Sequence, residues 1–99
     1  MALDLFACIS VADYTAALAW YERLLGGPPT YIASDEEAVW ELAAHRSLAI
    51  EYRPEHAGHA QVTVFVDDFD ARIAEIAARG LVPAERETYA NGARQGPLP

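Results

Sequence analysis

The chain contains no lysine, a single cysteine and no long apolar run. All 7 basic residues are therefore arginine, and 15 acidic residues outnumber them, so the formal net charge is −8. A surface with this charge repels the phosphates of nucleic acid, which argues against nucleic acid as a partner. The same charge favours neutral or cationic ligands, although it also serves simple solubility.

The scarcity of cysteine and of apolar stretches also limits where the protein can work. Cys8 has no second cysteine with which to form an internal disulfide, which suits a reducing compartment. No stretch approaches the roughly 20 apolar residues that a membrane helix requires. The opening residues Met-Ala-Leu-Asp lack the basic region of a secretory signal. We therefore expect a cytoplasmic protein without a membrane partner.

What the chain does have is an internal repeat. Its 99 residues predict one small domain, 1–99, and 53% apolar content is enough for a core. Within that domain, residues 8–18 are repeated, with lower similarity, in residues 63–73. Each copy is typical of a strand, a capping aspartate and an amphipathic helix. The repeat therefore predicts two similar modules, at about 1–54 and 59–99.

The two copies correspond at one constant offset, which is 66 − 11 = 55 residues. The matched pairs are Val11 and Val66, Asp13 and Asp68, Tyr14 and Phe69, Ala16 and Ala71, and Leu18 and Ile73.

The first module is expected to contain one helix and four strands. Alternation over 3–11 predicts a strand, and Asp13 is placed to cap a helix that continues to about Leu25. The run Gly26-Gly-Pro-Pro29 ends that helix, because glycine accepts the left-handed position and proline cannot continue a helix. Three short strands are expected at 30–33, 38–43 and 47–53.

The second module follows a linker at 54–58. It is expected to contain a strand at 59–66, a helix from the Asp68 cap to Arg79-Gly80, a strand near 82–88 and a turn at Asn91-Gly92. A final strand to match the first module is missing. Either the chain is cut short, or another molecule supplies the strand that would pair at this position. In the second case the open strand edge would be a pairing surface, and pairing itself would be the function.

Four strings carry a resemblance to a known family: Ile9-Ser-Val-Ala-Asp13, Ala19-Trp-Tyr-Glu-Arg-Leu-Leu-Gly26, Val64-Phe-Val-Asp-Asp-Phe-Asp-Ala71 and Arg79-Gly80. With them the chain resembles the vicinal oxygen chelate superfamily of glyoxalases, bleomycin resistance proteins and extradiol dioxygenases, over about residues 3 to 95. The resemblance implies an α+β fold in which paired βαβββ modules form a cupped mixed sheet. It also implies a ligand in the cup and a homodimer. The second module is incomplete, because the closing strand with its D-P-D-G-N-like signature is absent.

Strand alternation separates residues that pack under the helices from residues that would line the cup. The apolar sets around Ile9 and Val64 suit the helix side, and the opposite faces mix small polar and aromatic side chains, as a binding surface needs. Trp40 could stack on a flat ligand, and Glu51 could accept a hydrogen bond from a cation. Cys8 has no histidine to activate it, so we expect no catalytic residue. The predicted lining is Phe6, Cys8, Ser10, Trp40, Glu51, Gln61, Thr63 and Phe65.

The resemblance also implies four positions at which metal-dependent relatives hold a metal. They fall on Phe6, which cannot bind a metal, on Gln61, a weak ligand, on Glu51, a plausible one, and beyond Pro99. A catalytic site normally has at least three protein ligands, so we expect no metal and no other cofactor. If the strand register differs by one pair of residues, His59 would join Glu51 and Asp4.

Besides pairing, two functions remain open from the sequence. The first is a metal-free protein that holds a small organic ligand in the cup, as antibiotic-binding relatives do, with the acidic charge favouring a cation. The alternative is a divalent-metal-dependent lyase, isomerase or dioxygenase that uses Glu51 with Gln61 or His59. In that case the metal would act as a Lewis acid on vicinal oxygens.

Overall fold

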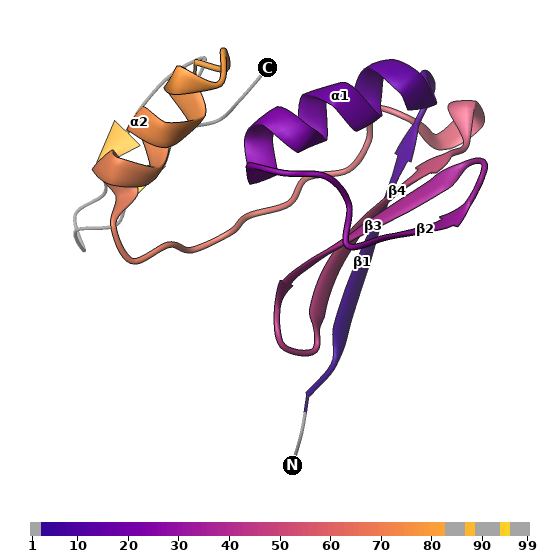
Figure 1. Cartoon of the computed structure of the whole chain (residues 1–99), viewed down its shortest axis with the longest axis horizontal. Helices are drawn as coiled ribbons and strands as arrows, with labels where there is room; N and C mark the ends of the chain where they lie inside the picture. Colours follow the sequence, from indigo (N-terminus) through magenta and orange to yellow (C-terminus); the bar gives the residue numbers. More distant parts are fainter. Residues whose placement is uncertain (1–2, 83–86, 89–93, 96–99) are drawn as a thin grey trace.

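The computed structural model describes residues 3–82, 87–88 and 94–95, and its first half is a four-stranded sheet crossed by one helix (Figure 1). No helix in these residues is long and apolar enough to cross a membrane. The elements in chain order are β1 (Leu5–Val11), α1 (Tyr14–Leu25), β2 (Tyr31–Ser34), β3 (Glu37–Ala43), β4 (Arg46–Tyr52), the short 3₁₀ turn η1 (Pro54–His56), α2 (Phe69–Ala78), β5 (Glu87–Thr88) and β6 (Arg94–Gln95).

The first half is a complete βαβββ module, so the prediction for this half is confirmed. Its strands lie in the order β1-β4-β3-β2. β1 runs parallel to β4, while β4 and β3, and β3 and β2, are antiparallel. A parallel neighbour requires a long crossover, which α1 and the β2–β3 hairpin supply. β1 and β2 are therefore the two edges of this sheet.

The ends of α1 follow directly from the local sequence. The Asp13 carboxylate accepts a hydrogen bond from the backbone N–H of Ala16 at 3.0 Å, which satisfies a donor that the first helical turn leaves free. At the other end, Gly26 has a φ of 89°, and its N–H donates to the carbonyl of Glu22 at 2.9 Å. Only glycine adopts this left-handed conformation without strain. Both predicted ends of α1 are confirmed.

The core lies between α1 and one face of the sheet. Ala38, Trp40 and Ile50 are almost completely buried there. The Trp40 indole Nε1 donates to the carbonyl of Gly27 at 3.1 Å, and its ring lies 5.9 Å from that of Tyr21. The partly buried side chains that pack on this cluster are Val11, Tyr14, Ala17, Leu18, Tyr21 and Leu25.

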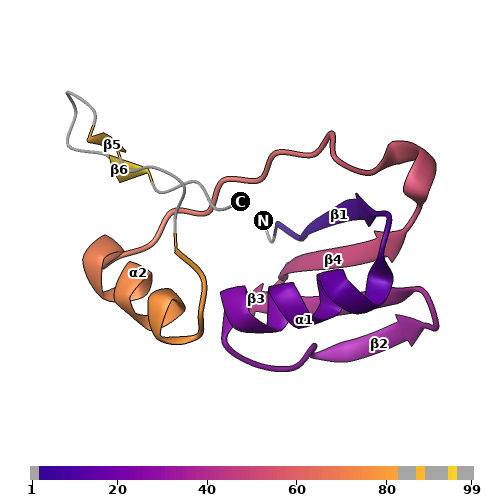
Figure 2. The same ribbon diagram turned by 90° about the horizontal axis from the view of Figure 1, so that it is seen from above.

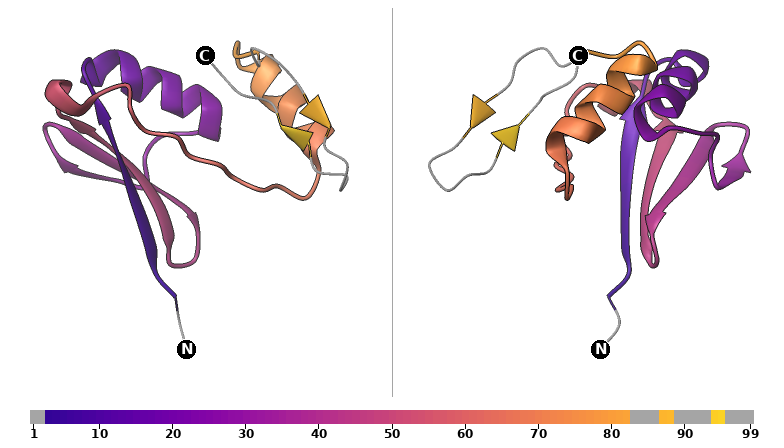
Figure 3. Two further views of the ribbon diagram at one scale, coloured as in Figure 1. Left: turned by 180° about the vertical axis from the view of Figure 1, so that it is seen from behind. Right: turned by 60° about the vertical axis from the view of Figure 1, so that its left-hand side comes forward.

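In the second half, the predicted helix is confirmed and the predicted strand before it is wrong. Asp68 caps α2, with its carboxylate accepting from the N–H of Ala71 at 3.0 Å. Residues 59–66, by contrast, form no strand, because they run past α1 to α2 without a neighbouring strand to bond (Figures 1 and 3). Of the strand predicted near 82–88, Glu87–Thr88 pairs with Arg94–Gln95. Residues 83–86 of that strand and the predicted turn at Asn91-Gly92 lie outside the described residues.

The two halves are joined by a polar contact between the helix ends. The guanidinium of Arg79, just after α2, donates to the backbone carbonyls of Arg23 and Leu24, the latter at 3.2 Å. These carbonyls lie in the last turn of α1, where they have no partner within the helix and carry partial negative charge. Arg79 therefore fixes α2 beside the C-terminal end of α1, away from the sheet (Figure 2).

Candidate functional site

The face of the sheet opposite α1, which we call the open face, carries most of the polar side chains that could meet a ligand. Residues paired across neighbouring strands point to the same side of a sheet. The pairs therefore define three rows on this face: Ser10, Glu51 and Glu37 with Ser34; Cys8, Ala49 and Val39 with Tyr31; and Phe6, Ser47 and Glu41.

The middle row of the open face is apolar. Val39 and Ala49 have no exposed surface at all. Tyr31, at the β2 edge of this row, is 53% exposed, and Phe6, in the next row on β1, is also 53% exposed. Val39 and Ala49 thus offer no surface to a ligand, and the two aromatic side chains toward the edges are the exposed aromatic part of this face.

The first row of the open face is acidic. Glu37 and Glu51 are directly opposed on β3 and β4. The Glu51 carboxylate lies 4.0 Å from the Arg53 guanidinium, which also lies 3.8 Å from Glu55. One arginine is therefore shared by two carboxylates, and Glu37 adds a third negative charge to this end of the sheet. A cation placed here would gain favourable electrostatic energy.

The acidic row changes the pKa of the Cys8 thiol. Partial burial raises the pKa of Cys8, the charges of Glu51 and Glu37 raise it further, and Arg53 acts in the opposite direction. Because the pKa lies above its usual value, the thiolate is even scarcer at neutral pH than in an ordinary cysteine. Cys8 is therefore a poor nucleophile and contributes to the open face as a small, weakly polar surface.

Neutralising Glu51 should make the Cys8 thiol more reactive. Glu51→Gln removes the charge that acts most strongly on this thiol after burial, so the Cys8 pKa should fall and the thiolate fraction at pH 7.5 should rise. We expect alkylation by iodoacetamide to become faster. Glu41→Gln, on the same face but in the third row, is the matched control and should leave the rate unchanged. Equal rates in all three proteins would contradict this electrostatic coupling.

The residues at the metal positions that the sequence suggested do not fit a metal ion. Phe6 offers only hydrocarbon to the open face, and the Glu51 carboxylate is paired with Arg53. His59 and Gln61 lie on the unpaired segment, so the structure does not bring them to Glu51. In the described residues there is no group of three or more histidine, cysteine or acidic side chains that could hold a metal.

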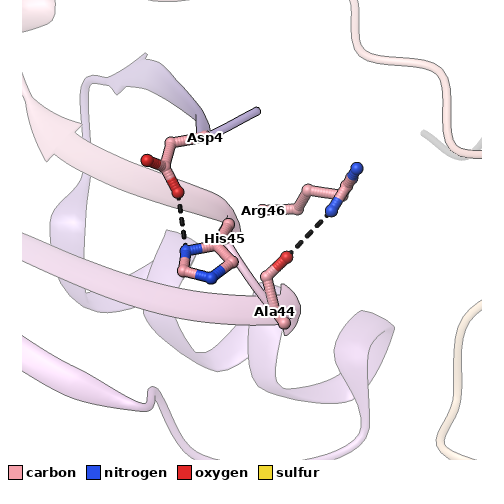
Figure 4. Close-up of polar contacts among 4 residues, drawn as sticks. All are labelled: Asp4, Ala44, His45 and Arg46. Atoms are coloured by element: carbon pink, nitrogen blue, oxygen red, sulfur yellow. Dashed lines mark hydrogen bonds and ion pairs between the residues drawn. The ribbon is translucent and has the colours of Figure 1, made fainter. Parts of the chain in front are cut away.

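Asp4 is also remote from Glu51. Its carboxylate lies 2.7 Å from Nδ1 of His45, in the β3–β4 turn, where Arg46 donates to the carbonyl of Ala44 at 2.9 Å (Figure 4). Leu5 pairs with Arg46, whereas Ser10 pairs with Glu51, so Asp4 and Glu51 lie at opposite ends of β1 and β4. Six residues of strand separate them, which is roughly 20 Å. The shared site with His59, Glu51 and Asp4 is therefore wrong.

The structure brings half of the predicted lining together. Phe6, Cys8, Ser10 and Glu51 share the open face. Gln61, Thr63 and Phe65 do not reach it in this chain, because residues 59–66 leave the sheet.

Trp40 was assigned to the wrong face, since it packs beneath α1. Sequence reasoning missed Glu37, Val39 and Tyr31, which the β3–β4 and β2–β3 pairings place on the open face. Glu37 could have been found from its position opposite Glu51. That position follows only when the register of the β3–β4 hairpin is known.

Comparison with known proteins agrees with this architecture. A family model described as "Glyoxalase/Bleomycin resistance protein/Dioxygenase superfamily" matches residues 3–97. A crystal structure of a glyoxalase / bleomycin resistance protein from Catenulispora acidiphila DSM 44928 is 52% identical, has a TM-score of 0.89, and is matched over 94% of this chain and 84% of that chain. A solved chain described as a conserved domain protein is 19% identical, with a TM-score of 0.61, over 98% of this chain and 90% of that one, and shows the fold alone.

A search of curated proteins finds no match. The family model nevertheless covers almost the whole chain, and the crystal structure shares half of its residues and its fold. These findings confirm the resemblance drawn from the two modules. The chain belongs to the glyoxalase/bleomycin resistance protein/dioxygenase superfamily.

Proposed function

We propose that the open face binds a small organic cation without the help of a metal ion. The observation that supports this most strongly is the opposed pair Glu37 and Glu51 on β3 and β4. The carboxylates would attract the positive charge, and the half-exposed rings of Phe6 and Tyr31 would cover the apolar part of the ligand. Such a combination of a few polar groups with apolar and aromatic surface is typical of small-molecule sites.

Binding, rather than chemical conversion, is the role that these residues support. The pKa of the Cys8 thiol is raised, and in the part of the chain that the structure describes no group of three or more histidine, cysteine or acidic side chains surrounds Glu51 and Glu37 to hold a metal. The matched crystal structure is of a protein named for bleomycin resistance as well as for glyoxalase. We therefore favour a cytoplasmic protein that sequesters its ligand, in the manner of an antibiotic-binding protein, over a metal-dependent lyase, isomerase or dioxygenase.

A matched series of three small probes tests the charge preference. Phenethylamine is a cation at pH 7, 2-phenylethanol is its neutral counterpart, and phenylacetate is an anion of similar shape. We expect phenethylamine to bind about fivefold more tightly than the alcohol, since a charge-assisted contact at a partly exposed site contributes about 1 kcal/mol. Phenylacetate should bind least. Titrations followed by amide chemical shifts give both the affinity and the location, which should include Cys8, Ser10 and Glu51.

Two controls sharpen this experiment. Glu51→Gln should remove most of the preference for phenethylamine over 2-phenylethanol, whereas Glu41→Gln, in the third row, should retain it. Protein purified without chelators should contain far less than one equivalent of zinc, nickel, manganese or iron by elemental analysis. Equal affinity for all three probes would contradict the cation site, and stoichiometric metal would favour the enzyme.

A further inference from the structure

We propose that Arg53 is a resident cation of the open face, which pairs with Glu51 while the face is empty and moves to Glu55 when a cationic ligand binds. Arg53 then sets how tightly and how selectively the site takes up cations, although it does not contact the ligand itself. This inference rests on the proposed function. It adds to that function a competitor within the chain that the ligand must displace.

The Arg53 guanidinium lies between two carboxylates and is held closely by neither. Its Nε is 4.0 Å from the Glu51 carboxylate and 3.8 Å from that of Glu55. A charge-assisted hydrogen bond is usually about 2.7 to 2.9 Å long. All three side chains are also partly exposed to water. Ion pairs of this length and exposure contribute little free energy, so the guanidinium can exchange between its two partners at little cost.

The backbone of Arg53 is fixed, although its side chain is not. The N–H of Arg53 donates to the carbonyl of Val11 at 3.0 Å, and the carbonyl of Arg53 accepts from the N–H of His56 at 3.0 Å. The first bond extends the pairing of β1 with β4 by one residue, and the second anchors the turn η1, which carries Glu55. Residues two apart on a strand lie on the same face, so Arg53 shares the face of Glu51. Rotation of the side chain alone is enough to change partners.

Glu37 supplies negative charge that Arg53 does not use. It lies directly opposite Glu51 on β3 and β4, and no arginine of the described residues is within ion-pair distance of it. A cation between the two glutamates would be attracted by both and repelled by the guanidinium that already lies beside Glu51. Movement of Arg53 to Glu55 removes this repulsion. Each of the three carboxylates then has a positive charge beside it.

The Cys8 thiol, on the same face, reports where Arg53 lies. Burial raises the pKa of Cys8, the charges of Glu51 and Glu37 raise it further, and Arg53 lowers it. The reactivity of the thiol therefore depends on how closely the guanidinium approaches Glu51. This gives a measurement of the position of Arg53 that requires no ligand.

A double-mutant cycle between Arg53 and Glu55 tests the proposal. Arg53→Gln removes the competitor, so it should bind phenethylamine about threefold more tightly than the unaltered protein does, as expected for the loss of an exposed ion pair. Glu55→Gln removes the alternative partner and keeps Arg53 on Glu51, so it should bind phenethylamine about threefold more weakly. The affinity for the neutral 2-phenylethanol should be the same in all variants.

The double variant, Arg53→Gln with Glu55→Gln, separates this mechanism from a general effect of charge. It loses one positive and one negative group, so its formal net charge stays at −8. If Glu55 acts through Arg53, the double variant should bind phenethylamine as tightly as Arg53→Gln alone. If Glu55→Gln weakens binding by the same factor with and without Arg53, Glu55 acts on the ligand directly and the proposal is overturned.

Arg46→Gln is the matched control, because it removes the same charge from the other end of β4. Arg46 donates to the carbonyl of Ala44 in the β3–β4 turn. It lies roughly 17 Å along the strand from Glu51, which exceeds the screening length of about 8 Å at physiological salt. We expect its affinity for phenethylamine to be unchanged. An increase equal to that of Arg53→Gln would show that net charge alone sets the affinity, against the proposal.

Alkylation of Cys8 by iodoacetamide repeats the cycle without a ligand. Glu55→Gln should raise the rate, because the guanidinium then stays beside Glu51 and reduces its effect on the thiol. Arg53→Gln should lower the rate, and adding Glu55→Gln to it should change nothing further. An effect of Glu55→Gln that is the same in both backgrounds would contradict the sharing of the guanidinium.

The two measurements distinguish failure of this proposal from failure of the proposed function. If the unaltered protein prefers phenethylamine to 2-phenylethanol and Arg53→Gln leaves both affinities unchanged, the proposed function stands and the role of Arg53 is wrong. If no variant prefers phenethylamine, the proposed function fails, and displacement of Arg53 by a ligand fails with it. The alkylation rates then still decide whether Glu51 and Glu55 share Arg53.

Discussion

Trp40→Ala should lower the free energy of unfolding by about 4 kcal/mol, the largest effect that we expect from any single substitution. The indole fills the space between α1 and the sheet beside Ala38 and Ile50, and its exposed fraction is only 4%. Truncation removes this apolar contact and leaves a cavity that the surrounding strands cannot close. It also leaves the carbonyl of Gly27 without its hydrogen bond. Urea unfolding followed by far-ultraviolet circular dichroism measures the loss.

Trp40→Phe is the matched control, because it retains a ring in the core and loses only the indole N–H and part of the volume. We expect it to cost about 1 to 2 kcal/mol. This variant also tests the face on which Trp40 lies. Its affinity for phenethylamine should equal that of the unaltered protein, since the side chain lies under α1. A large loss of affinity in Trp40→Phe, with little loss of stability, would place the indole on the open face and contradict the structure.

Gly26→Ala should cost about 2 kcal/mol, the second largest effect. Gly26 has a φ of 89°, at which a side chain is strained by about 1 to 2 kcal/mol. A β-carbon built there would also lie 3.4 Å from the Arg79 guanidinium carbon, which bonds the end of α1. The substitution therefore strains the helix end through its backbone conformation, while the added carbon meets Arg79 at an ordinary van der Waals distance.

Gly27→Ala separates these causes from a general effect of adding a methyl group. Gly27 is not among the glycines with positive φ, and a β-carbon there would meet no atom within 4 Å. We expect a change of less than about 0.5 kcal/mol. Gly26→Asn should cost less than Gly26→Ala, because asparagine tolerates the left-handed region better. Equal losses for Gly26→Ala and Gly27→Ala would contradict the strain argument.

The helices were predictable because their ends are local. Asp13 and Asp68 accept hydrogen bonds from residues three positions later, at 3.0 Å in both cases. Such a bond requires no partner from elsewhere in the chain, so the sequence alone places it. The strands of the first module were predictable for a similar reason, since turn residues and alternation mark their limits. These features also carried the resemblance to the superfamily.

The face on which Trp40 lies was not predictable, because an irregularity in the hairpin decides it. Ala43 pairs with Arg46 across the two-residue turn, and continuing this register would pair Trp40 with Ala49, on the open face. The register shifts between Glu41 and Ala43, so Trp40 pairs with Leu48 instead. A shift of one residue moves every side chain of a strand to the other face. The same shift brings Glu37 opposite Glu51.

The sequence by itself determined the two helices, the positions of the first four strands along the chain and the family. Only the tertiary structure decided which side chains of β3 meet α1, and that residues 61–66 stay apart from their own sheet. The reason is that a strand, unlike a helix, bonds its backbone groups to another segment. Alternation in a sequence shows that a stretch can be a strand, but the identity of its neighbour depends on contacts made far along the chain or in a second molecule.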